Sequence, residues 1–398
     1  MPPHSPSNRL HRLSYPILLA TAIAGLLTLA AAAQDDGQQY RVINIRDEDN
    51  VTRHIQSWLD LAPDGRTLAV APTQSFPFRL YDLQEGRITR TLDVGNWYAG
   101  ARSTFSSSGR YLVLQQLFYL DMAPNKVRSV KFEVVDVASG ASIFRAEDIY
   151  AAALSPDERI LYTLGPNGLD VIDPVSGKRD PIRRLERLGH AVAVSTDGTR
   201  VAVAHRPTRA ELAAMPSVRN DKDALKALEK VGNIVVIYDA ATLTPVHTLN
   251  EPFDKVFRLV YSADGRDLWI HAKPHTRKGS AMDPRQSYVS IADAGTGGMR
   301  RTAFPSLSTY EPDFRISPDG RLFGIVSQGR KFMEIHLYER ETGRMVDRFE
   351  LSYRFADATP LKDGEFGADG RLSFTFLPDG RNIWMTFGTR LIEWTYAP

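Results

Sequence analysis

The chain has 398 residues, of which 43% are hydrophobic and 24% are charged. This composition excludes a largely disordered or collagen-like chain, and the length allows a large buried core. The formal net charge is only +2, and cysteine is absent, which excludes disulfides, thiolate zinc sites, a cysteine nucleophile and Cys-x-x-Cys-His haem attachment.

The first 33 residues have the pattern of a secretory signal peptide. A basic start around Arg9 precedes a mostly apolar run at residues 17–33, which ends in three alanines before Gln34. Because a membrane-spanning helix needs about 20 apolar residues, this run is short for a stable anchor. We expect cleavage before Gln34 and a periplasmic or secreted bacterial protein with no stable membrane insertion. The alternative is an uncleaved anchor.

Cleavage at this position also changes the charge balance. Residues 1–33 contain two arginines and no acidic residue, so the mature chain has equal numbers of basic and acidic side chains. The sequence pI of about 8.6 therefore gives no indication of nucleic-acid binding. We expect no nucleic-acid partner.

A five-residue turn pattern, close to Ser-Pro-Asp-Gly-Arg, recurs seven times along the chain. Proline presets φ, aspartate bonds to its own backbone, and glycine accepts a positive φ, so each copy predicts a tight hairpin. The spacing between neighbouring copies runs from 40 to 67 residues, and the shortest spacing is typical of one propeller blade. The copies are residues 62–66, 106–110, 155–159, 195–199, 262–266, 317–321 and 377–381.

Strand patterns surround each of these turns. A short apolar stretch precedes the turn and a second apolar stretch follows it. A third stretch ends in an acidic residue, as in Tyr81-Asp82 and Tyr238-Asp239, and a glycine turn then leads to a short fourth stretch. Four strands in each of seven repeats predict an all-β fold: a seven-bladed β-propeller of four-stranded antiparallel blades over residues 34–398.

The last repeat shows only three strands before the chain ends. We expect residues 40–45 to supply the outer strand of this blade, because that pairing closes the ring and removes two open edges. A loose N-terminal extension is the alternative. An eighth copy of the turn pattern, at residues 367–371, is expected to lead into the last blade.

The fourth blade carries a helical insertion at about residues 205–232. We predict helices at residues 208–215 and 221–231, with Asn220 as the cap of the second. Ala224, Leu225, Leu228 and Val231 form one apolar stripe on this helix. The stripe either packs on the rim of the propeller or forms a lid or a docking helix for a partner.

The repeats resemble those of a known group of proteins. Ser155-Pro156-Asp157 and residues 169–178 are similar to a YVTN-type repeat, and residues 40–396 as a whole resemble bacterial WD-repeat-like propellers. The Trp-Asp dipeptide of eukaryotic WD repeats is not present. The resemblance implies the fold and leaves the function open.

The candidate binding surface lies on the face that carries the long connections between strands, because function tends to be located on variable loops of a rigid scaffold. Its aromatic side chains could stack on a ligand or pack between blades. Its histidines and arginines could bind an anion or an acidic partner, or form a solvated basic loop. The candidate residues are Trp97, Tyr98, Leu225, Leu228, His271, His275, Arg277, Arg285, Tyr310 and Tyr353.

Signatures of common catalytic sites are missing from the sequence. There is no Gly-x-Ser-x-Gly, His-Glu-x-x-His, phosphate-binding loop or dinucleotide fingerprint. We therefore assign no catalytic, cofactor-binding or metal-binding residue and expect no cofactor. The first hypothesis is an exported non-enzymatic scaffold that binds a protein partner or a ligand through the loop-rich face.

Two enzyme-related alternatives remain. The chain is similar in size, export and repeats to the propeller subunits of periplasmic quinoprotein amine dehydrogenases, which place the cofactor on a partner chain. A lactonase-like hydrolase is the other alternative. It requires an arginine, a histidine and a carboxylate that converge in the central opening.

Overall fold

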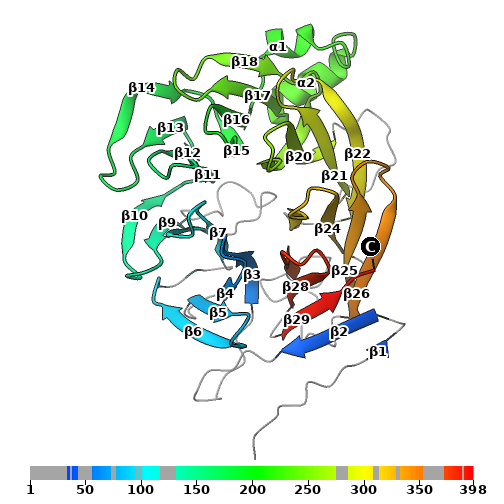
Figure 1. Ribbon diagram of the computed structural model, residues 1–398. Helices are drawn as coiled ribbons and strands as arrows, with labels where there is room; N and C mark the ends of the chain where they lie inside the picture. The colour runs from blue at the N-terminus through cyan, green and yellow to red at the C-terminus, as the bar shows by residue number, and fades with distance from the viewer. Residues whose placement is uncertain are drawn as a thin grey trace, which may run out of the picture.

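Seven antiparallel β-sheets stand around a common axis as the blades of a propeller (Figure 1). Six sheets have four strands and the seventh has five, which confirms the predicted fold class. The computed structural model of the chain describes residues 34–35, 38–43, 56–72, 78–95, 97, 101–116, 131–274, 286–307, 313–328, 332–352, 372–387 and 390–397.

The blades are numbered along the chain, and each begins with its innermost strand (Figure 1). Blade 1 contains β3 (Gln56–Leu61), β4 (Thr67–Pro72), β5 (Phe78–Asp82) and β6 (Arg87–Leu92). Blade 2 contains β7 (Ala101–Phe105), β8 (Tyr111–Gln116), β9 (Lys131–Asp136) and β10 (Ser142–Glu147). Blade 3 contains β11 (Ala151–Leu154), β12 (Leu161–Gly165), β13 (Gly168–Ile172) and β14 (Arg179–Leu185).

The remaining blades continue around the ring. Blade 4 contains β15 (Gly189–Val194), β16 (Arg200–His205), β17 (Ile234–Asp239) and β18 (Pro245–Thr248). Blade 5 contains β19 (Phe253–Tyr261), β20 (Asp267–Pro274), β21 (Gln286–Asp293) and β22 (Met299–Leu307). Blade 6 contains β23 (Phe314–Ile316), β24 (Leu322–Gln328), β25 (Phe332–Glu339) and β26 (Met345–Ser352). Blade 7 contains β27 (Leu372–Phe376), β28 (Asn382–Phe387), β29 (Arg390–Thr395), β2 (Gln38–Ile43) and β1 (Gln34–Asp35).

The recurrent turns join the first and second strands of each blade, as their chemistry predicts. In blade 1, Gly65 has a φ of 66°, and its N–H donates to the carbonyl of Ala62 at 2.9 Å. The Asp64 carboxylate accepts the backbone N–H groups of Arg66 and Thr67, both at 2.8 Å. These turns define one face of the ring, which we call the turn face.

The N-terminal strand closes the ring, which confirms the predicted closure. In Figure 1, β2 lies beside β29, and the register pairs Tyr40 with Trp394 and Ile43 with Leu391. The strand spans residues 38–43 instead of 40–45, and β1 adds a fifth strand outside it. Residues 44–45 and the eighth turn copy at 367–371 lie outside the described residues.

Aromatic side chains pack at this closure. The ring of Tyr40 meets Phe349 edge-on at 5.7 Å, and Phe349 lies 5.2 Å from Trp394. Phe349 belongs to β26 of blade 6, so the closing strand stabilises the contact between blades as well as its own sheet. The first strands of neighbouring blades also contact each other around the axis, as β3 does with β7 and β27.

The predicted insertion forms two helices at the outer rim of blade 4, α1 (Arg209–Ala214) and α2 (Lys222–Val231) (Figure 1). Thr208 and Glu211 form a capping box at the start of α1. The prediction of Asn220 as the cap of α2 is wrong. Asp221 caps this helix, because its carboxylate accepts the N–H of Ala224 at 2.9 Å.

The apolar stripe of α2 packs on the propeller. Ala224, Leu225 and Leu228 are buried in one cluster with residues of blades 3 and 4. The inclusion of Val231 in the stripe is wrong, since this last helical residue is 55% exposed. The predicted signal peptide, residues 1–33, lies outside the described residues. In the part of the chain that the structure describes, no helix is long and apolar enough to cross a membrane.

Leu228 and Val231 provide a matched test of this packing. Leu228→Ala should lower the free energy of unfolding by about 2–5 kcal/mol, because it leaves a cavity under α2. Val231→Ala should change it by less than about 0.5 kcal/mol, because the side chain faces solvent. Urea denaturation of both variants measures the difference, and equal effects would contradict the docked helix.

Candidate functional site

Four of the residues predicted for the binding surface are buried, so their assignment to that surface is corrected. Leu225 and Leu228 belong to the core under α2. Trp97 is only 2% exposed and packs in the cluster between blades 1 and 2, with the Lys131 ammonium 4.3 Å from its ring centre. Trp97 therefore packs between blades, which was one of the two alternatives for the aromatic candidates.

The fourth corrected residue, His271, is fully buried in β20. Its Nε2 lies 3.1 Å from the Ser287 hydroxyl, and its ring lies 5.4 Å from Phe257 and 6.0 Å from Phe314. A candidate of the loop-rich face would have to lie in a loop or at the end of its strand. Here the strand continues to Pro274, so His271 is placed inside the blade.

The other six candidates are Tyr98, His275, Arg277, Arg285, Tyr310 and Tyr353, and they lie outside the described residues. Their place on the loop-rich face stays a prediction. The described residues instead bring charged side chains together around the central axis.

Asp313, which directly precedes β23, is the centre of this charged group. Its carboxylate is fully buried and accepts from the Ser373 hydroxyl at 2.8 Å and from the Phe374 N–H at 3.1 Å. It also accepts from the guanidinium groups of Arg258 and Arg315, both at 3.1 Å. One carboxylate therefore connects blades 5, 6 and 7.

Arg315 extends this network across the axis to blade 1. Its guanidinium donates to the Asp60 carboxylate at 2.7 Å and to the Leu59 carbonyl at 2.6 Å. Asp60 in turn accepts the Phe105 N–H of blade 2 at 2.7 Å, and the Leu59 N–H donates to Ser373 at 3.0 Å. The network thus joins five of the seven blades.

The indole of Trp58 lies against this group of cations. The guanidinium carbons of Arg102, Arg258 and Arg315 lie 5.9, 5.9 and 5.4 Å from its ring centre. Arginine is attracted to the face of an indole, and this attraction strengthens where water is excluded. We call Trp58, Asp60, Arg102, Arg258, Asp313 and Arg315 the charged cluster.

Arg315 stays charged in this surrounding. Its side chain is 13% exposed, and burial alone would lower the pKa of its guanidinium. The carboxylates of Asp313 and Asp60 outweigh this effect and raise the pKa above its ordinary value. The ion pairs therefore persist over the range of pH in which the carboxylates are ionised.

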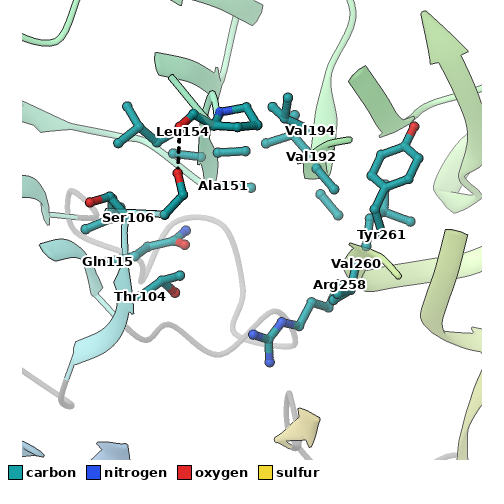
Figure 2. A pocket seen from close by; sticks show the side chains of 18 of the residues that line it. Thr104, Ser106, Gln115, Ala151, Leu154, Val192, Val194, Arg258, Val260 and Tyr261 are labelled. Carbon is teal, nitrogen blue, oxygen red and sulfur yellow. Dashed lines mark hydrogen bonds between the residues drawn. The ribbon is translucent and has the colours of Figure 1, made fainter. Parts of the chain in front are cut away.

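Opposite the charged cluster, the innermost strands of blades 3 and 4 are apolar apart from His190. Their sequences are AAAL in β11 and GHAVAV in β15. Between these strands and those of blades 2 and 5 lies a cavity of about 550 Å³, which we call the channel cavity. Figure 2 shows Ala151, Leu154, Val192 and Val194 on its apolar side.

The channel cavity has a polar wall on its other side. Arg258 projects into it from β19, and Thr104 and Gln115 line it from blade 2 (Figure 2). Arg102 also lines the cavity and donates to the Gln115 side-chain oxygen at 2.6 Å. Among the described residues that line the cavity, both charged ones are arginines and none is a carboxylate.

The channel cavity extends along the inner strands to the turn face. Its lining includes Ser106, Pro156 and Ser195, which belong to the turns after β7, β11 and β15. This cavity therefore lies near the short turns, whereas the sequence favoured the loop-rich face. Short turns leave the end of the axis open, and the sequence pattern does not show how inner strands converge on that axis.

Sequence reasoning missed the charged cluster. The available signal was a charged residue inside the first strand of a repeat, as at Asp60, Arg258 and Arg315. Such a residue must face the axis or find an ionic partner, because an unpaired buried charge is costly. The partners lie in other blades and far away in the sequence, so the pairs could not be assigned.

The described carboxylates near the channel already have ionic or hydrogen-bond partners. Arginines and carboxylates converge there, but Asp313 is fully buried, and Asp60 is bonded to Arg315 and to a backbone N–H. His271, near Arg258, is buried and bonded to Ser287. In the described residues, no histidine joins an accessible carboxylate at the cavity as a lactonase-like site requires.

Comparisons with known proteins agree on the fold alone. No protein-family model matches the sequence, and no protein of curated function matches it. The structure is similar to the Cps50 (Swd1) β-propeller domain of Myceliophteria thermophila, with a TM-score of 0.57 and 12% identity, over 87% of this chain and 98% of that chain. It is also similar to hydrazine synthase of Kuenenia stuttgartiensis, with a TM-score of 0.58 and 16% identity, over 87% of this chain and 97% of that chain.

Asp313→Asn tests the role of the buried carboxylate. Removal of this charge takes away the buried carboxylate that two partly exposed guanidinium groups share, and should lower the free energy of unfolding by about 3–5 kcal/mol. Glu186→Gln breaks an exposed ion pair with Arg184 and should cost less than about 1 kcal/mol. Urea denaturation compares the two variants, and similar losses would argue against the network as a support of the ring.

Buried histidines predict a loss of stability in acid. Burial, assisted by Arg187, lowers the pKa of His205 from 6.5 to about 4, and burial with Arg258 lowers that of His271 to about 3. Because the folded pKa lies below the unfolded one, the neutral forms contribute stability that is complete above pH 6.5 and declines as the pH falls toward 4. The free energy of unfolding should drop by several kcal/mol over this range, on the order of 1.4 kcal/mol per pKa unit.

His205→Gln is the control for this pH dependence. Glutamine keeps a polar group near the Tyr238 hydroxyl, which lies 2.8 Å from Nε2 of His205, but it does not titrate. The variant should show a weaker decline between pH 6.5 and 4 in the same urea series. An unchanged pH profile would exclude His205 as a source of the effect.

Proposed function

We propose that this chain is an exported, non-enzymatic binding protein and that the channel cavity is its ligand site. The observation that carries this proposal is a preformed cavity of about 550 Å³, with two arginines on one side and apolar strands on the other. Ligand sites in proteins have this size and this combination of an apolar lining with a few polar groups.

The surroundings of the cavity favour binding over chemistry. A general base must reach its substrate, but the carboxylates of the charged cluster already accept hydrogen bonds from arginines and backbone N–H groups. These bonds hold Arg258 and Arg315 in place before a ligand arrives. A rigid site of this kind reduces the entropy lost on binding.

The proposal also includes export and a protein partner on the loop-rich side. Export is supported by the signal pattern of residues 1–33. On the exposed side of α2, Lys222, Lys226 and Lys230 follow one another at four-residue intervals. Residues four apart share one face of a helix, so this basic row fits a partner with an acidic surface.

Native mass spectrometry of the exported protein tests the function. The intact mass should correspond to a chain that starts near Gln34, and the native spectrum should show a small molecule that is lost on denaturation. Thr104→Trp should lose this molecule, because Thr104 is an exposed side chain that lines the cavity.

Two results would contradict the proposal. One is a ligand-free protein that retains nothing from a metabolite extract of its source. The other is equal retention of a ligand by the wild type and by Thr104→Trp, which would place the site elsewhere. A chain that keeps residues 17–33 and sediments with membranes would contradict cleavage before Gln34.

A further inference from the structure

We infer that the channel cavity selects an amphipathic monocarboxylate: a molecule with one carboxylate and a linear apolar body. This inference rests on the proposed function and names the ligand class of the same site. Three features of the cavity support it: the sign of its charges, their depth below the turn face and its apolar wall.

The charges that line the cavity select an anion. Arg102 and Arg258 are the charged residues in its described lining, and no carboxylate is among them. Guanidinium groups bind carboxylates through paired N–H donors, which makes arginine the usual partner of a carboxylate in a partly buried site. The two arginines would repel a cationic ligand. A neutral ligand would not form ion pairs with them.

The two arginines are held in position by groups that the ligand does not replace. Arg258 donates to Asp313 at 3.1 Å and to the Phe314 carbonyl at 3.0 Å, and it is 18% exposed. Arg102 donates to Gln115, whose amide nitrogen bonds in turn to the carbonyl of Tyr150. The two arginines come from different blades, 2 and 5, and both guanidinium carbons lie 5.9 Å from the Trp58 ring centre, so one carboxylate in the cavity can reach both.

The arginines lie at the deep end of the cavity. Arg102 stands four residues before the turn that begins at Ser106, and Arg258 stands four residues before the turn that begins at Ser262. Strands rise about 3.3 Å per residue, so both side chains start roughly 13 Å below the turn face. A carboxylate bound there would leave its body pointing along the channel.

Below the turns, the wall beside that path is apolar. Ala151 to Leu154 and Ala191 to Val194 line the cavity from blades 3 and 4, and Val260 lines it from blade 5. Alanines dominate, so the strands leave room for an unbranched chain. Each methylene group buried against such a surface strengthens binding.

Titration calorimetry with the mature full-length chain tests this inference. The probe is octanoate, and its matched controls are octan-1-ol and octylammonium, which keep the body and change only the head group. Octanoate should bind at least tenfold more tightly than either control. Butanoate should bind more weakly than octanoate, because it leaves most of the apolar wall uncovered.

Variants connect the binding to the named residues. Arg258→Gln and Arg102→Gln should each weaken octanoate at least tenfold and reduce the preference over octan-1-ol. Arg102→Gln is the safer of the two, since Arg258 also bonds to the buried Asp313 carboxylate. Arg159→Gln removes an arginine that is 83% exposed and outside the cavity, and it should leave the affinity unchanged.

The outcomes separate this inference from the proposed function. If octylammonium or octan-1-ol binds as well as octanoate, or if both cavity-arginine variants bind octanoate like the wild type, the ligand class is wrong. The ligand class is also wrong if octanoate does not bind but the wild type retains another small molecule that Thr104→Trp loses. In that case the proposed function stands. If nothing retained by the wild type is lost by Thr104→Trp, both fail.

Discussion

The buried carboxylate of Asp313 is the interaction on which the centre of this propeller depends. It accepts hydrogen bonds from two guanidinium groups, a hydroxyl and two backbone N–H groups in three consecutive blades. A carboxylate in this position is stable only because every partner is present at once, since a buried charge without partners costs several kcal/mol. The same bonds hold Arg315 across the axis, where it meets blade 1 near the seam of the ring. Ring closure thus has an outer component, in which β2 pairs with β29, and an inner one made of ion pairs.

The charged cluster occupies one side of the axis and leaves the other side to alanine, valine and leucine. Because the innermost strands of blades 3 and 4 carry small apolar residues, the channel cavity forms beside them. Arg258 belongs to both regions: it bonds to Asp313 and lines the cavity. A group that stabilises the ring therefore also sets the electrostatic character of the cavity. Because Arg258 takes part in both, the centre of the ring is polar even though the blades pack mainly through apolar faces.

The helical insertion illustrates a second kind of constraint. Two helices joined to a blade lose conformational entropy, and this loss is offset by burial of Leu212, Leu225 and Leu228 against blades 3 and 4. The Arg187 guanidinium, in the connection before blade 4, adds a bidentate pair with Glu211 at 2.9 and 2.6 Å. The apolar side of α2 is thereby used in the core, and only its polar side remains for a partner. An amphipathic sequence alone is compatible both with a helix that packs on the propeller and with a helix that docks a partner.

The sequence by itself determined the fold, because the turn chemistry and the strand alternation are local. Glycine in six of the seven turns, an acidic residue at the end of the third strand in six blades and a strand before the first repeat together define seven blades and their closure. The tertiary structure alone decided which side chains meet at the axis. Asp60 and Arg315 are 255 residues apart in sequence, and no periodic pattern pairs them. It also decided that Leu225, Leu228, Trp97 and His271 are interior, because burial depends on what the neighbouring blade places opposite each strand or helix.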